Sequence, residues 1–398
     1  MRILVASPFL PHPEATHGGA VYLGAFLEAL GAKAEVALVS FVRPSELRWQ
    51  SRPAPGLALV RGLTLRQNFD LQARQLMAHR AKMAWRWGAE GKPLLAAKFW
   101  TPAMVDLLTR TAAEFKPDLA LVEFAIMAQY LPHLGDLPTV LTDHEHGQTG
   151  SAIAPFGLGR KRDQQLWGRY VREYYGQATL VQALNEDDAR RLVELIGREV
   201  EIRPPVVPIP ALPCAPGASG ARAIFLGDFT HKPNPESARF LAHEVWPKVR
   251  RRLPAAELVL AGPRADDAIK SLGKLPGVQF VGFVEHLATL FGQMRALVAP
   301  MFSGAGSRIK ILTALAHGLP VISNELGLRG VDAPRTAARL GRNAEEIAAH
   351  VVALLEDPRE ATRAGEAARA WAIQRLHPAQ LAEAQLERFT TLLAAGKR

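Results

Sequence analysis

The stretch that decides the fold runs from Ala299 to Val331 and reads APMFSGAGSRIKILTALAHGLPVISNELGLRGV. An apolar run ends in the small-residue turn 303–307, and an apolar helix is expected over 311–316. Gly318 then ends the helix, and residues 320–323 are expected to form the next strand. A strand that leads through a glycine-rich turn into a helix N-terminus suits a phosphate group, because backbone N–H groups and the helix dipole both favour negative charge.

Length and composition limit the number of domains and the class of protein to be expected. Its 398 residues are enough for two domains, and the composition is that of an ordinary soluble globular protein. The single cysteine, Cys214, excludes an intramolecular disulfide and a multi-cysteine metal site, which fits a reducing compartment. The apolar run at the start is too short for a signal peptide, and no run of 18 apolar residues occurs. We therefore expect a cytoplasmic protein.

The net charge of +10 is concentrated in one part of the chain. Residues 61–100 contain eight basic side chains against two acidic ones, with Trp85, Trp87 and Trp100 among them. Basic residues with interfacial aromatics suit an anionic membrane surface, which would place the protein peripherally at the inner membrane face. The same residues could line a cleft for an acidic substrate or form a solvated helical face. No nucleic-acid partner is expected, since no nucleic-acid-binding module is recognisable.

Strand and helix patterns alternate along both halves of the chain. This alternation predicts parallel, doubly wound sheets. We expect helices over 20–30 and 235–253 and a basic helical region from about 47 to 115. The expected strands are 3–7, 35–41, 119–123, 139–142 and 179–183 in the first half, and 223–227, 257–261, 278–281, 296–300 and 320–323 in the second.

A proline-rich segment separates the halves. Six prolines between Arg203 and Gly220 exclude a helix or a central strand there. We therefore predict a first Rossmann-like domain over 1–204, a linker over 205–219 and a second domain over 220–377. A final helix within 378–398 carries an apolar stripe and is expected to return to the first domain. Ligands of such sheets bind at the carboxyl ends of the strands, so two facing domains imply a cleft between them.

The second half resembles a known enzyme family. The segments that carry the resemblance are FLGDF at 225–229, KPN at 232–234, WP at 246–247, LVLAG at 258–262, VGFV at 281–284, the turn and helix start at 303–312, and GLPVIS at 318–323. Their order and spacing resemble a family 4 retaining glycosyltransferase of the GT-B fold. The first half is similar more loosely, through Gly18-Gly19 and Asp143-His144.

The resemblance implies an α/β protein whose two doubly wound domains face a cleft, with the second domain binding a nucleotide-diphosphate sugar. It implies transfer of the sugar to a glycan, lipid-linked or small-molecule acceptor, with retention and without a metal or other cofactor. Lys310 and Lys232 take the places of basic residues on the diphosphate, and Lys310 is expected to bury little. The implied donor-binding residues are Gly18, Gly19, Gly227, Phe283, Gly304, Ala305, Gly306, Ser307, Arg308 and Thr313.

The segment Asp143-His144-Glu145-His146 follows an expected strand. Taken alone it could bind a metal, but neighbouring residues of an extended chain point to opposite sides, so that at best alternate members converge. In the resembling family a histidine at this strand end lies beside the donor sugar. His144 fits that place best, as a residue that orients the reacting groups.

The chain departs from the resembling family at two positions. That family usually has two glutamates around the glycine turn, and their places fall on Ala305 and Thr313. A threonine hydroxyl in place of a carboxylate could weaken nucleotide binding by about 1–3 kcal/mol. Ala305 and Thr313 together favour an alternative in which the protein is a degenerate binding or scaffold subunit without turnover. Another GT-B enzyme, such as a nucleotide-sugar epimerase, is a third reading.

Overall fold

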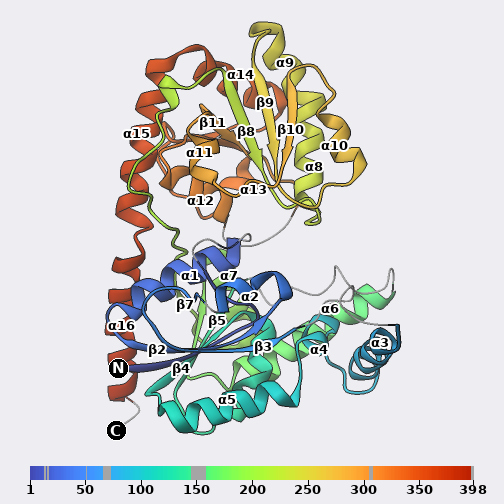
Figure 1. Cartoon of the computed structure of the whole chain (residues 1–398), viewed down its shortest axis with the longest axis vertical. Helices are drawn as coiled ribbons and strands as arrows, with labels where there is room; N and C mark the ends of the chain where they lie inside the picture. The colour runs from blue at the N-terminus through green and yellow to red at the C-terminus, as the bar shows by residue number, and fades with distance from the viewer. Residues whose placement is uncertain are drawn as a thin grey trace. The chain divides into compact units, whose positions relative to one another are not determined.

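The computed structural model describes residues 1–12, 15, 18–50, 52–65, 73–144, 158–303 and 308–395. The chain forms two compact units, shown in Figure 1. The first unit comprises Met1–Ala15, Ala20–Pro205 and Ala379–Arg398, and the second comprises Thr16–Gly19 and Val206–Pro378.

The first unit is built on a parallel sheet with strand order β3-β2-β1-β4-β5-β6-β7. Its strands are β1 (Arg2–Ser7), β2 (Glu35–Val42), β3 (Leu57–Thr64), β4 (Leu119–Glu123), β5 (Thr139–Asp143), β6 (Leu180–Ala183) and β7 (Glu201–Ile202). The central strands are almost continuously apolar, as expected for a parallel sheet covered on both faces. The helical segments are α1 (Gly18–Gly31), η1 (Pro44–Glu46), α2 (Leu47–Gln50), α3 (Ala73–Gly88), α4 (Leu94–Lys98), α5 (Pro102–Phe115), η3 (Ala125–His133), α6 (Leu158–Tyr175), α7 (Glu186–Ile196) and α16 (Pro378–Ala395).

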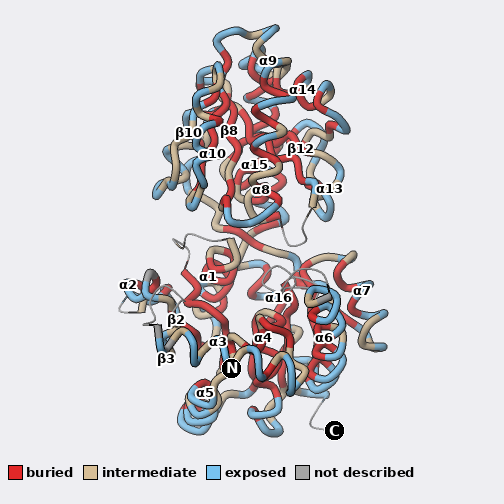
Figure 2. Tube along the Cα trace, turned by 90° about the vertical axis from the view of Figure 1, so that its right-hand side faces the viewer, coloured by how far each residue is buried: buried red, intermediate tan, exposed pale blue. Residues whose placement is uncertain are grey.

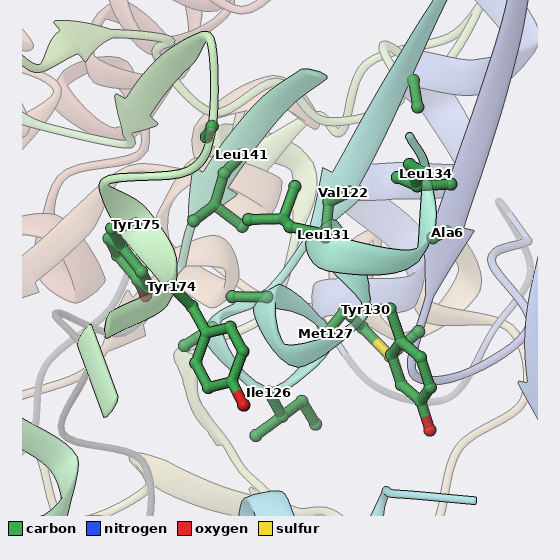
Figure 3. Packing of buried hydrophobic residues seen from close by; sticks show 14 of the residues in the cluster. Ala6, Val122, Ile126, Met127, Tyr130, Leu131, Leu134, Leu141, Tyr174 and Tyr175 are labelled. Carbon is green, nitrogen blue, oxygen red and sulfur yellow. The ribbon is translucent and has the colours of Figure 1, made fainter. Parts of the chain in front are cut away.

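The segment η3 places a large apolar group against the sheet of the first unit. Figure 3 shows Met127 and Leu131 of this segment gathered with Val122 of β4 and Leu141 of β5. Tyr130 is also fully buried there, and its hydroxyl donates to the carbonyl of Phe99 at 2.6 Å. This packing fixes the carboxyl ends of β4 and β5, where Glu123 ends β4 and His144 follows β5.

The second unit is built on a parallel sheet with strand order β10-β9-β8-β11-β12-β13. Its strands are β8 (Arg222–Leu226), β9 (Glu257–Ala261), β10 (Val278–Gly282), β11 (Ala296–Val298), β12 (Val321–Ser323) and β13 (Ala338–Leu340). The helical segments are η4 (Pro216–Ala218), α8 (Pro233–Phe240), η5 (Leu241–Val245), α9 (Trp246–Arg252), α10 (Asp267–Leu272), α11 (Leu287–Phe291), α12 (Ile309–Ala316), α13 (Glu325–Leu328), α14 (Ala344–Glu356) and α15 (Pro358–Arg375). Figure 2 shows buried strands and helix faces inside each unit and exposed residues on the outer helices.

The expectation of doubly wound parallel sheets is confirmed in both units. In each sheet the chain starts at an inner strand, moves to one edge and then crosses to the other side, so the strand order reverses beside β1 and beside β8. Such reversal points are where ligands bind in open α/β sheets. All ten expected strands are present, with ends that differ by up to two residues.

Three edge strands were not expected, and one expectation was wrong in part. The strands β3, β7 and β13 were not anticipated, and β3 interrupts the region from 47 to 115 that was expected to be helical. The sequence of β3, LALVRGLT, is only partly buried and contains Arg61 and Gly62, which weakens its strand pattern. The strands β7 and β13 have two and three residues, too few for a periodic signal.

The final helix α16 belongs to the first unit. Its Phe389 is fully buried, and Gln385 accepts a hydrogen bond from Gln182 of β6 at 2.9 Å. Arg388 pairs with Glu201 of β7, with N–O distances of 2.5–3.1 Å. An apolar stripe and two polar links therefore hold this C-terminal helix beside strands that lie far from it in the sequence.

Candidate active site

Lys310 lies in the first turn of α12, after the glycine-rich turn. It is half-buried: its Nζ donates to Oδ1 of Asn234 at 2.5 Å and lies 4.7 Å from the ring centre of Phe225. Desolvation, followed by the charge of Arg308, lowers the pKa of Lys310 to about 7. The expectation that Lys310 would bury little is wrong, because residues from β8 and α8 cover it. No carboxylate among the described residues pairs with this ammonium group.

Asn234 is itself held in place by the turn after β8. Its Nδ2 donates to the carbonyl of Asp228 at 2.7 Å while its Oδ1 accepts from Lys310. A Cβ atom at Gly227 would lie 2.6 Å from Cγ of Asn234, which is closer than real Cβ contacts allow. Gly227, expected as a donor-binding residue, therefore has a packing role that places Asn234 and, through it, Lys310. Ser237 adds a hydrogen bond from its hydroxyl to the carbonyl of Pro300 at 2.6 Å.

Arg308 precedes α12 in a left-handed backbone conformation, with φ of 54°. Its side chain is buried, and Nε and Nη2 donate to the carbonyl of Leu326 in α13 at 3.1 and 2.9 Å. A second cation is thus fixed close to Lys310, which raises the local positive potential. An anion at the start of α12 would meet two cations and the helix N-terminus together.

The other expected residues of the second unit are placed less closely. Lys232 immediately precedes α8, its side chain is 82% exposed, and Nζ lies 3.7 Å from Glu236. Phe283 follows β10 and is exposed, while Thr313 lies half-buried in α12. Gly304, Ala305, Gly306 and Ser307 lie outside the described residues.

A buried charge cluster lies at the strand ends of the first unit. Glu123, the last residue of β4, accepts two hydrogen bonds of 2.7 Å from the guanidinium of Arg203, which follows β7. The Nε2 atom of His144, the residue after β5, lies 2.7 Å from Oε2 of the same carboxylate. Glu123 and Arg203 are fully buried, and His144 is 5% exposed.

The pKa values of the cluster follow from burial and pairing. Burial alone would raise the pKa of Glu123, but the charge of Arg203 and the hydrogen bonds from His144 and Arg203 outweigh it and lower the value to about 2. For His144, burial lowers the pKa below its ordinary value, and Arg203 opposes the charged form further, against the raising effects of Glu123 and Asp143. At neutral pH the cluster therefore contains a carboxylate, a guanidinium and an uncharged imidazole.

Aromatic rings fix the imidazole of His144 in position. Phe124 stacks on it with ring centres 3.7 Å apart and an interplanar angle of 12°, and Tyr22 of α1 meets it edge-on at 5.4 Å. Phe124 has φ of 71° and ψ of 140°, a conformation that costs a non-glycine residue about 1–3 kcal/mol. Strain of this kind persists only where the surrounding structure imposes it, and here it accompanies the stacking on His144.

The remaining expected residues of the first half are placed as follows. Gly18 and Gly19 begin α1 and are grouped with the second unit. Asp143 ends β5 and accepts a hydrogen bond of 2.8 Å from the hydroxyl of Tyr175. Glu145 and His146, which completed the alternative metal motif, lie outside the described residues. Within the described part of the chain no group of three potential metal ligands occurs.

Sequence reasoning missed four residues that complete these arrangements: Glu123, Arg203, Asn234 and Phe225. Phe225 and Asn234 stood inside quoted motifs, and Glu123 is a carboxylate that ends an otherwise apolar strand, which is an available signal. Arg203 gave no such signal, because it precedes two prolines at the start of the linker.

Comparisons with known proteins agree with this architecture. Residues 220–357 match the family described as Glycosyl transferases group 1. A sucrose-phosphate synthase from Thermosynechococcus elongatus superposes with a TM-score of 0.69 at 16% identity, covering 99% of this chain and 100% of that one. HepE from Anabaena, solved in complex with UDP, gives 0.64 at 14% identity, covering 98% and 100%. A TarM variant from S. aureus, in complex with Fondaparinux, alpha-GlcNAc-glycerol and UDP, gives 0.65 at 10% identity, covering 98% and 99%.

No curated protein sequence matches the chain significantly. The solved structures are too distant in sequence to show more than the fold, which is that of the two-domain GT-B glycosyltransferases. The family match covers the part of the second unit that contains Lys310, Asn234 and Gly227.

The packing at Gly227 gives a test of the site geometry. We expect Gly227→Ala to lower the free energy of unfolding by about 1–3 kcal/mol, because the added methyl group must displace the Asn234 side chain. The matched control is Gly220→Ala, where the nearest atom is 3.9 Å from the added Cβ, and a change within about 0.5 kcal/mol is expected. Urea denaturation of both variants measures the difference. Equal stability of G227A and the parent would remove the packing role assigned to Gly227.

Proposed function

We propose that the protein transfers a sugar from a nucleoside-diphosphate sugar to a hydroxyl group of a glycan or lipid-linked acceptor. The observation that carries the proposal is Lys310: a half-buried, desolvated lysine at the helix start that follows the glycine-rich turn, in the domain that matches a glycosyltransferase family. HepE and TarM were solved with UDP, which makes UDP the first nucleotide to test here.

Lys310 and Arg308 supply the chemistry that such a transfer needs. The diphosphate leaving group gains negative charge as its bond to the sugar breaks, and fixed cations stabilise that charge in the transition state. Lys232, exposed before α8, is a third cation that a bound diphosphate can recruit from solvent. We propose that these side chains neutralise the diphosphate without a metal ion, and that the transfer retains the anomeric configuration. His144 contributes a hydrogen bond to the sugar.

The rival assignment is a binding subunit without turnover, which Ala305 and Thr313 in place of the resembling family's glutamates favour. The half-buried placement of Lys310 argues against it, because desolvating a lysine that has no carboxylate partner among the described residues is costly unless an anion binds. A nucleotide-sugar epimerase would need the same diphosphate contacts and is distinguished by its product.

Replacement of Lys310 tests the proposal. We expect Lys310→Ala to lower turnover at least about tenfold, because one charge-assisted contact to the leaving group is lost. Its melting temperature should not fall below that of the parent by more than a few degrees, since removing an unpaired desolvated cation offsets the packing that is lost. Sugar transfer and donor hydrolysis are measured in the presence of EDTA. The donors tested are sugars linked to uridine, adenosine or guanosine diphosphate.

Lys270→Ala is the matched control, because Lys270 on α10 is an exposed lysine paired only with Asp267 at 3.2 Å, and its turnover should equal that of the parent. Unchanged turnover of K310A would remove Lys310 from the site. Activity that vanishes in EDTA and returns with magnesium or manganese would contradict the metal-free mechanism.

The lowered pKa of Lys310 predicts proton uptake on nucleotide binding. With a pKa near 7 the free lysine is mostly neutral at pH 8, and a bound diphosphate favours the ammonium form, so binding takes up close to one proton. Calorimetry with UDP at pH 8, in buffers of different ionisation enthalpy, measures this number. Lys310→Met should abolish most of the uptake. Equal proton counts for the parent and K310M would show that Lys310 does not change its charge on binding.

One helix of the basic region favours contact with an anionic membrane surface. Several basic residues of 61–100 are engaged inside the first unit: Arg61 pairs with Glu114, Arg86 with Glu90, and Lys92 with Glu173. The exposed face of α3 is different, and this helix lies at the periphery of the first unit beside α4 (Figure 1).

The exposed face of α3 combines Met77 and Trp85, which are 72% and 64% exposed, with the exposed basic residues Arg74, Arg80 and Lys82. We propose that this face, rather than the whole basic region, lies on the headgroups and brings the protein to a lipid-linked acceptor. No helix within the described ranges is long and apolar enough to cross a membrane.

Vesicle sedimentation tests the α3 face. We expect more binding to anionic than to neutral vesicles, with about 1 kcal/mol from each basic residue near the surface and a steep loss at moderate salt. Trp85→Ala with Met77→Ala should reduce the salt-resistant part. Leu212→Ala is the control, since Leu212 is an exposed apolar residue of the second unit. Equal pelleting with anionic and neutral vesicles would contradict the membrane assignment and would favour an acceptor that is not linked to a lipid.

A further inference from the structure

A hollow of about 480 Å³, the β13 hollow, lies at the edge strand of the second sheet. The described residues that line it are Arg335, Thr336, Arg339, Leu340, Arg342 and His350. Three of these side chains carry a guanidinium, one carries a hydroxyl and one an imidazole, and none carries a carboxylate. The lining therefore offers a ligand positive charge and hydrogen-bond donors, with apolar surface from Leu340 alone.

A tight turn before β13 brings two of the lining residues to the surface. The carbonyl of Pro334 accepts hydrogen bonds from the N–H groups of Ala337 and Ala338, both at 2.8 Å. The two alanines are buried, whereas Arg335 and Thr336, which precede them, are exposed. The side chain of Arg335 makes no hydrogen bond or ion pair with the described part of the chain. The fold thus presents an arginine without a counter-charge at this edge.

The other two arginines are held by neighbouring carboxylates. The side chain of Arg339 is 12% exposed, and its Nη2 donates to Oε1 of Glu360 on α15 at 2.5 Å. The backbone N–H of Arg342 donates to Oε2 of Glu346 on α14 at 2.9 Å, and its guanidinium lies 3.6 Å from the same oxygen. That guanidinium is 72% exposed, so the ion pair neutralises it weakly. Arg335 and Arg342 are therefore the cations that a ligand can neutralise.

A second hollow of about 480 Å³, beside α9 and the start of α14, has a different lining. It contains the carboxylates of Glu244 and Glu345, and Lys248 pairs with Glu345 at 2.6 Å. The rings of Phe240 and Phe302, with centres 4.9 Å apart, add apolar surface. The positive net charge of the chain therefore does not by itself exclude carboxylates from a hollow, and their absence from the β13 lining is specific to that place.

We propose that the β13 hollow binds a ligand through a phosphate group. A guanidinium can donate two parallel hydrogen bonds to phosphate oxygens, and both Arg335 and Arg342 gain a counter-charge when a phosphate binds. Thr336 supplies a hydroxyl donor beside them, and Arg339 supplies a guanidinium whose position is already fixed. The volume lies within the range of about 300–1,000 Å³ that is typical of small-ligand sites. This inference does not depend on the proposed sugar transfer.

Protection of the sheet edge is the competing explanation of these arginines. Charged side chains on an edge strand hinder its pairing with strands of other molecules. However, β13 has only three residues, and the carbonyl of Leu340 already accepts a hydrogen bond from Nε2 of His350 at 3.1 Å. Edge protection predicts that loss of the charge causes aggregation without a change in phosphate binding. Phosphate recognition predicts weaker binding by a protein that stays monomeric.

Calorimetric titration of the full chain with inorganic pyrophosphate tests the proposal. The titrations are made in the parent and in Lys310→Met, which removes the cation assigned to the donor. We expect pyrophosphate binding to persist in K310M, and Arg335→Gln to weaken this remaining binding at least about tenfold through the loss of charge-assisted hydrogen bonds. In the parent, Arg335→Gln with Arg342→Gln should remove one class of binding sites. Lys at position 335 keeps the charge without the planar fork, so R335K should recover only part of the affinity.

Arg252→Gln is the matched control. Arg252 is an exposed arginine of α9, 3.7 Å from Glu356, and it does not line the β13 hollow, so R252Q removes the same charge elsewhere in the unit. Its affinity for pyrophosphate should stay within about twofold of the parent. Equal weakening by R252Q and R335Q would show general attraction of anions and would overturn the site. Aggregation of R335Q with unchanged affinity would also overturn it, in favour of edge protection.

Two further ligands identify the source of the phosphate. Glycerol 3-phosphate represents a soluble ester, and phosphatidylcholine vesicles that contain phosphatidic acid represent a lipid headgroup. Weaker binding of glycerol 3-phosphate by R335Q would support a soluble ligand, and weaker binding of the vesicles alone would support a lipid. Unchanged binding of pyrophosphate, glycerol 3-phosphate and vesicles by the folded double variant R335Q/R342Q would overturn the proposal.

Discussion

Parallel strands must be covered on both faces, and this requirement determines where the polar groups of the protein can lie. The central strands of both sheets are buried and almost entirely apolar, so side chains that carry charge are pushed to the strand ends. Glu123 ends β4, His144 follows β5 and Arg203 follows β7, while Asp228 and Asn234 follow β8. Both candidate sites are consequences of this one constraint.

The buried cation of the first unit and the half-buried cation of the second have different surroundings. Arg203 has its counter-charge within the protein, since Glu123 meets it with two hydrogen bonds of 2.7 Å. Removing either partner would leave an uncompensated buried charge, so the pair stabilises the first unit only as long as it is complete. Lys310 has a neutral amide and an aromatic ring as neighbours instead, and its pKa falls to about 7. Arg203 is thus already paired with a carboxylate, whereas Lys310 has no carboxylate partner among the described residues.

The architecture could be predicted from the sequence because the patterns that indicate a doubly wound sheet are local. Apolar runs such as 258–261 and the glycine turn before α12 can be identified without knowing their neighbours. The site depends instead on partners that lie far away in the chain: Lys310 meets Asn234 across 76 residues, and Arg203 meets Glu123 across 80. No periodicity relates such residues, so the burial of Lys310 and the charge state of the cluster could not be predicted.

The residue at position 313 affects the charge state of Lys310. The two residues are three apart on α12, a spacing that places their side chains on the same helix face. A glutamate at this position would offer Lys310 a permanent counter-charge and would raise its pKa toward the ordinary value. With threonine there, the ammonium form depends on whatever anion binds. Threonine at this position thus leaves Lys310 without the counter-charge that a glutamate would supply, so that an added anion can determine its charge state.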